Sequence, residues 1–181
     1  MALPSFYDLD DLQQVAVNLF YGWGFNFYRA ENQLRTDDQM VREKTGWLLG
    51  LAREAVQTQL AAYRRAFLPL PTRDKPLPDA SAVEAAHALE DFSTAIGRLE
   101  GTIRSLPVPE TDRMTQRFRE EAPTLLRLRD HDTRLVGRAQ MLLDLLAGRD
   151  HAWLLAHMAE LRNGLALIAE DVQGRQALLK I

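Results

Sequence analysis

The chain has 181 residues and a net charge of −3. This length suffices for one substantial hydrophobic core, and we expect a single domain spanning residues 1–181. The charge excludes the basic excess of a general nucleic-acid binder, and the lack of cysteine excludes disulfides and thiolate chemistry. MALPSFYDLDD does not resemble a signal peptide, and no run reaches the roughly 18 apolar residues of a membrane span, so we expect a soluble, cytoplasmic protein.

The first predicted helix covers residues 9–34 and contains an unusual concentration of aromatic side chains. The chain holds seven Phe, four Tyr and three Trp, and six of these residues lie within LFYGWGFNFYR, Leu19–Arg29. Because the apolar residues surround the helix, we expect it to be central in the fold or covered by a partner. Gly22 and Gly24 weaken a helix, and they suggest the close approach of another backbone.

A second helix is predicted over residues 37–67, starting at a capping box formed by Thr36 and Gln39. If the chain folds back near Arg35–Thr36, Gly24 meets Gly46 in a tight antiparallel hairpin. The alternative is one continuous helix, because Leu34, Val41 and Leu48 keep a seven-residue step across the turn. We favour the hairpin.

Prolines at 69, 71, 76 and 78 predict a surface loop over residues 68–80. Ser81 and Glu84 then form a second capping box, opening a helix over residues 82–106. The apolar positions of this helix alternate in steps of four and three, which predicts coiled-coil-like packing. They are Ala85, Leu89, Phe92, Ile96, Leu99, Ile103 and Leu106.

Two further helices are predicted over residues 110–147 and 151–179. Pro123 kinks the fourth helix or restarts it, while Gly148 and Asp150 are suited to end one helix and cap the next. The apolar stripe of the last helix runs through Leu154, Met158, Leu161, Leu165, Ile168, Val172 and Leu179. With no strand pattern anywhere, the sequence predicts an all-α fold, an elongated antiparallel bundle of about five long helices.

The aromatic stretch is the first candidate site, as core, as a protein interface or as one wall of a pocket. A pocket would lie between the first two helices, with Arg29 holding an anion. The membrane-surface interpretation is weaker, because the flanks lack a Lys/Arg-rich face. The candidate residues are Phe20, Tyr21, Trp23, Phe25, Phe27, Tyr28, Arg29 and Trp47.

Two polar clusters have residue types suited to a metal or an acid–base site. Glu84 and His87 have the Glu-x-x-His spacing of carboxylate-bridged metal bundles, but His157 and Glu160 run in the reverse order, so we expect no metal site. In Asp130-His131-Asp132 only Asp132 falls in core register. A buried carboxylate requires a partner such as an Arg or His from another helix, and we interpret Asp132 as a buried polar contact that fixes helix register.

The arginines at 127, 129, 134 and 138 are interleaved with Asp130 and Asp132, which favours a solvated, ion-paired helix face. No catalytic residue or cofactor is assigned. The sequence favours a non-catalytic bundle that acts through protein–protein contact and self-associates as a homo-oligomer. The alternative is a small-molecule-binding or enzymatic bundle with the aromatic pocket.

Overall fold

The computed structural model describes residues 34–73, 77–106 and 122–179, and within these ranges it contains five α-helices and no strand. The all-α helical bundle predicted from the sequence is confirmed. Residues 9–33 of the helix expected over 9–34, and residues 110–121 of the helix expected over 110–147, lie outside the described residues. The described helices are α2 (Leu34–Phe67), α3 (Ala80–Arg104), α5 (Ala122–Leu146), α6 (His151–Ala156) and α7 (Met158–Leu179).

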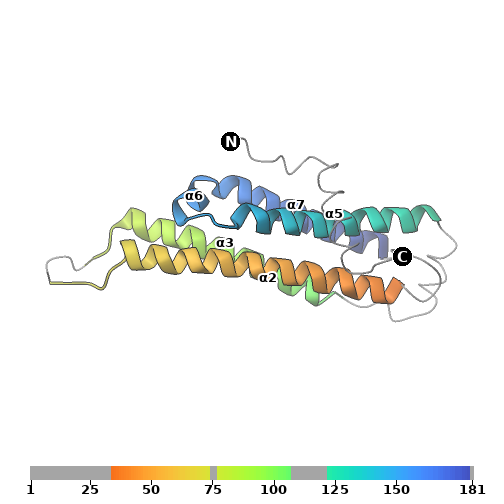
Figure 1. Cartoon of the computed structure of the whole chain (residues 1–181), viewed down its shortest axis with the longest axis horizontal. Helices are drawn as coiled ribbons and strands as arrows, with labels where there is room; N and C mark the ends of the chain where they lie inside the picture. Colours follow the sequence, from red (N-terminus) through yellow and green to blue (C-terminus); the bar gives the residue numbers. More distant parts are fainter. Residues whose placement is uncertain (1–33, 74–76, 107–121, 180–181) are drawn as a thin grey trace.

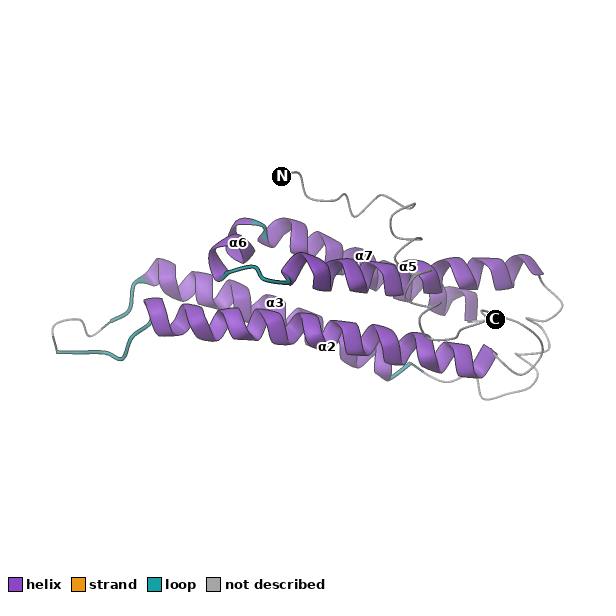
Figure 2. Ribbon diagram, viewed as in Figure 1, coloured by secondary structure: helices purple, strands orange, loops and turns teal. Residues whose placement is uncertain are grey.

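The helices form two antiparallel pairs that lie side by side along a common axis (Figure 1). α2 and α3 make one pair, joined by the loop over residues 68–79, and α5 and α7 make the other. α2 also packs on α5, and α3 on α7, which joins the pairs into one bundle. The short helix α6 lies at the end of the bundle from which the α2–α3 loop protrudes (Figure 2).

One contiguous hydrophobic core receives side chains from all five described helices. The four-and-three spacing predicted the buried face of α3 well, since Leu89, Phe92, Ile96, Leu99 and Ile103 are all buried, whereas Ala85 is only partly buried. Leu106 is also buried, although it lies beyond the last residue of α3. The periodic apolar stripe therefore packs α3 against its neighbours, because each apolar side chain removed from water contributes to stability.

The beginning of α2 differs from the prediction. The turn expected at Arg35–Thr36 is wrong, because both residues lie inside α2, and Thr36 is therefore not the helix cap. A capping box is a local signal, and here the chain continues the helix through it. Whether the residues before Leu34 fold back along α2 lies outside the described part of the chain.

The ends of the other helices use partly different residues from those expected. The cap of α3 is Asp79 rather than Ser81: the Asp79 carboxylate accepts a hydrogen bond from the Ser81 backbone N–H at 3.3 Å. Gly148 ends the fourth helix with a φ of 68°, a left-handed conformation that only glycine adopts readily. Asp150 caps α6 as predicted, with the Trp153 N–H at 2.8 Å.

The last predicted helix is interrupted at His157, which separates α6 from α7. The carbonyl of Trp153 accepts two hydrogen bonds from this residue, one from the backbone N–H at 3.1 Å and one from the ring Nδ1 at 2.8 Å. A side chain that competes for a helical carbonyl favours a local departure from the helix, and His157 has φ −109° and ψ 15°. None of the helices in the described ranges is long and apolar enough to cross a membrane.

Candidate functional site

Of the eight residues proposed for an aromatic interface or pocket, only Trp47 belongs to the described part of the chain; Phe20, Tyr21, Trp23, Phe25, Phe27, Tyr28 and Arg29 lie outside it. Trp47 is on α2 and keeps 50% of its surface exposed. The ammonium nitrogen of Lys44, one helical turn earlier, lies 4.1 Å from the centre of the indole ring. This distance is that of a cation–π contact, which holds the ring against the helix surface.

The surroundings of Trp47 are largely closed. Lys44 itself is buried, and burial lowers the pKa of its ammonium group. Thr45 is fully buried and donates to the carbonyl of Val41 at 2.7 Å. Trp47 is thus a large, half-exposed aromatic side chain, and the residues next to it in α2 are buried.

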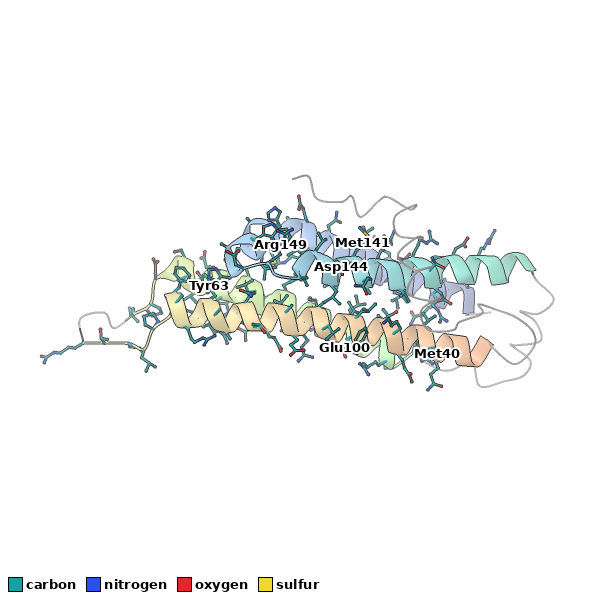
Figure 3. The ribbon with its side chains drawn as sticks, viewed as in Figure 1. Met40, Tyr63, Glu100, Met141, Asp144 and Arg149 are labelled. Carbon is teal, nitrogen blue, oxygen red and sulfur yellow. The ribbon has the colours of Figure 1, made fainter. Side chains whose placement is uncertain are left out.

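Gly46, which was expected to allow the close approach of another helix, lies against the side chain of Arg104 of α3. A Cβ added to Gly46 would lie 3.1 Å from the Arg104 guanidinium Nε, so the arginine side chain crosses α2 at this point. Arg104 also donates to Glu100 at 3.0 Å, and Glu100 lies 3.9 Å from Arg53 of α2. Figure 3 labels Glu100 at this α2–α3 interface. The expected contact between Gly46 and Gly24 involves a residue outside the described ranges.

The second candidate site is a buried ion-pair network between α5 and α7. Asp132 of α5 is fully buried, and its Oδ1 accepts from the Nε of Arg175 of α7 at 2.5 Å. The Arg175 side chain is only 2% exposed. A buried carboxylate and guanidinium each lose hydration, so this pair is sustained by its short, charge-assisted contact.

A second pair lies a short distance along the same interface, with its charges reversed between the helices. Arg138 of α5 donates through Nη1 to the Asp171 carboxylate at 2.6 Å and to the Leu167 carbonyl at 2.9 Å. Arg134 approaches the other oxygen of Asp171 at 3.8 Å. Burial raises the pKa of Asp171, and the two arginines act against that rise.

His131 lies at the edge of the α5–α7 network. Its Nδ1 is 3.9 Å from Asp171 Oδ1, beyond hydrogen-bond reach, and this nitrogen is buried without a hydrogen-bond partner. Burial lowers the pKa of His131, Arg134 lowers it further, and Asp130 works in the opposite direction. The ring lies over Gly174 of α7, where it fills the space of an absent side chain.

These contacts decide what chemistry the α5–α7 network can perform. Both carboxylates are ion-paired with arginines, burial lowers the pKa of His131, and no hydrogen-bond partner lies within reach of its Nδ1. General acid–base catalysis needs a group within reach of the proton that it moves. The network is suited to fixing α5 against α7.

The residues with metal-ligand spacing are not brought together. His87 is exposed on α3, 3.9 Å from Glu90, and His157 is the capping residue stacked on Trp153. No group of three His, Asp or Glu side chains within the described ranges could hold a metal ion.

The sequence pattern does not identify Asp171 and Arg175 as parts of a site. The solvated face predicted for the α5 arginines is wrong at Arg138, which is buried where it pairs with Asp171. Arg175 left a detectable signal, because it occupies the one position at which the apolar stripe of the last helix is broken, between Val172 and Leu179. Asp132 breaks the stripe of the fourth helix in the same way, and opposite charges at two such gaps point to a pair.

Comparisons with protein-family models, with curated proteins and with solved structures found no match. The residues and their geometry are therefore the basis for a functional assignment.

Proposed function

We propose that this protein is a non-catalytic, cytoplasmic helical bundle that acts through protein–protein contact and self-associates through the surface around Trp47 and the aromatic stretch Leu19–Arg29. The observation that carries the proposal is the half-exposed indole of Trp47 on α2. Tryptophan is among the residues most enriched at the energetic centres of protein interfaces. The six aromatic residues of Leu19–Arg29 supply further side chains of the same kind.

The location of Trp47 supports this interpretation. Lys44 holds the indole by its cation–π contact, so the ring is already ordered before a partner arrives. A side chain that is fixed in advance loses less entropy on binding.

The buried charges of the α5–α7 network pair with one another, which favours a structural role for the interface between α5 and α7. A chain without cysteine needs no oxidising compartment, in keeping with the cytoplasm.

The experiment is light scattering on a sizing column at two protein concentrations and physiological salt, with the full chain and two variants. Trp47→Glu places a charge at the proposed contact. Ala61→Glu adds the same charge to another exposed position of α2 and serves as the matched control. Loss of a central interface tryptophan costs about 2 kcal/mol or more, so we expect Trp47→Glu to weaken association about 30-fold.

A monomeric wild-type protein at both concentrations would overturn self-association. A Trp47→Glu variant that associates like the wild type would overturn the placement of Trp47 in the interface. Phe25→Asp then tests the aromatic stretch. A folded variant that no longer associates supports the interface, whereas loss of the helical circular dichroism signal means that the stretch is core. If the protein is monomeric, a ligand that changes tryptophan fluorescence would favour the alternative, a small-molecule-binding or enzymatic bundle.

A further inference from the structure

The segment Leu68–Arg73, Leu-Pro-Leu-Pro-Thr-Arg, leaves the end of α2 with a backbone that its sequence largely fixes. Each proline ring holds its own φ near −65°. The residue before a proline is pushed away from helical values toward extended ones. Leu68 and Leu70 precede Pro69 and Pro71, so these four residues are all biased toward the polyproline II conformation. The structure has no helix or strand over residues 69–72.

The Leu68–Arg73 segment is presented to solvent. Leu68 packs partly against the core, and its backbone N–H donates to the backbone carbonyl of Arg64 at 2.9 Å, which anchors the start of the segment to α2. The five residues from Pro69 to Arg73 are exposed, and Leu70 keeps 87% of its surface accessible. Figure 2 shows this part of the chain extending beyond the ends of α2 and α3. The segment is therefore reachable by a partner from several sides.

The side chains of Leu68–Arg73 follow a recognisable order. A polyproline II helix has about three residues per turn and a rise of about 3.1 Å per residue. Leu70 and Arg73 are three residues apart, so a polyproline II conformation over these residues places them on one edge, separated by about 9 Å. Proline-rich segments dock into aromatic-lined grooves, which exploit the preformed polyproline II backbone. Arg73, the cation at the end of the segment, adds an ion pair with a carboxylate of the partner. This ion pair determines in which of its two orientations the segment lies in the groove.

We propose that Leu68–Arg73 is a docking motif for a protein domain with an aromatic-lined groove for polyproline II segments, of the SH3 or WW kind, and a carboxylate facing Arg73. This surface is distinct from the one around Trp47 and does not depend on self-association.

A lipid surface is the other environment that could take up exposed leucines. Phe67 and Leu77, beside the motif, are also exposed. However, Arg73 and Lys75 are balanced in sequence by Asp74 and Asp79, so the loop has no excess of positive charge. Attraction to anionic lipid depends on such an excess, at about 1 kcal/mol per basic residue. The charges thus favour a protein groove over a membrane.

The test is binding of the full chain, immobilised through one terminus, to a panel of purified SH3 and WW domains. The variants are Pro69→Ala combined with Pro71→Ala, and Arg73→Glu. Pro78→Ala is the matched proline control in the same loop, and Arg65→Glu is the charge control at the exposed end of α2. Because all these positions are exposed, circular dichroism should show the same helical content for every variant.

We expect at least one domain to bind the wild type, and both motif variants to weaken it about tenfold or more, as for loss of an interface hot spot. The two control variants should bind the same domain with a dissociation constant within about twofold of the wild-type value. The proposal is overturned if no domain in the panel binds, or if the motif variants bind like the wild type. Sedimentation with anionic phosphatidylserine vesicles that is lost in Leu70→Ser would assign the loop to membranes instead. In light scattering, the motif variants should have the same molar mass as the wild type. This result separates the docking test from the test of self-association.

Discussion

Gly174 of α7 gives the ring of His131 its place between α5 and α7, and replacing it with alanine tests this packing. An added Cβ would lie 2.5 Å from Cε1 of His131 and 3.1 Å from its Nδ1, too close for either atom to stay where it is. Overpacking of this kind costs about 1–3 kcal/mol. Alanine in a helix interior gains about 1 kcal/mol over glycine. We therefore expect Gly174→Ala to range from neutral to about 2 kcal/mol destabilising.

The sign of the Gly174→Ala effect should reverse when the ring is removed. In a His131→Ala background the clash is gone, and Gly174→Ala should stabilise the protein by up to about 1 kcal/mol. Gly101→Ala is the control, because a Cβ there meets no atom within 4 Å. The assay is urea unfolding followed by tryptophan fluorescence for the four proteins of the cycle. A coupling below about 0.5 kcal/mol between positions 131 and 174 would refute the packing argument.

The remaining predictions concern the charges of the α5–α7 network. Asp132→Ala removes the buried carboxylate that pairs with the Arg175 guanidinium, and urea unfolding should show that the free energy of unfolding falls by about 3–5 kcal/mol. Replacing both partners, Asp132→Leu with Arg175→Met, should lower the free energy of unfolding less than the single change does. The folded-state pKa of His131 lies below its ordinary value of 6.5, so the unfolded chain takes up the proton first as the pH falls. The stability that neutral His131 contributes is therefore lost as the pH drops through 6.5 toward the lower folded-state pKa. In thermal melts, the melting temperature should depend less steeply on pH for His131→Gln than for the wild type or the control His87→Gln.

Most of the described fold follows from apolar spacing, because burying one stripe per helix is the main gain in a bundle. The α3 stripe from Leu89 to Ile103 illustrates this, since the residues at its four-and-three steps are buried. The helix boundaries were less predictable. Asp79 and Ser81 are both good caps, two residues apart, and local sequence could not rank them.

The interruption at His157 could not be predicted from periodicity, since the apolar stripe passes through it unchanged. Its cause is a side-chain hydrogen bond to the Trp153 carbonyl, which depends on a ring position that spacing does not encode. The α5–α7 network was predictable in part. Asp132 stood in the core register and called for a cation from another helix, but identifying Arg175 required the relative register of two helices.

The arrangement of charges between α5 and α7 gives this network a purpose beyond stability. Asp132 faces Arg175, whereas Arg138 faces Asp171, so in these two close pairs each helix supplies one charge of each sign. Sliding α7 by four residues, about 6 Å, would bring Asp132 to Asp171 in one direction and Arg138 to Arg175 in the other. Both neighbouring registers therefore place like charges together in a buried interface, which is costly.

This argument predicts the effect of exchanging one pair. Asp132→Arg combined with Arg175→Asp restores opposite charges at that pair, but it places both cations on α5 and both carboxylates on α7. A slide by four residues then brings opposite charges together at one position, so the like-charge repulsion in that register disappears, whereas one charge on each helix still loses its partner. We expect the exchanged protein to stay helical by circular dichroism while its α5 and α7 amide signals double in nuclear magnetic resonance spectra, as two registers become populated. The wild type should give a single set. A single set in the exchanged protein would refute the argument that like-charge repulsion is what excludes the neighbouring register.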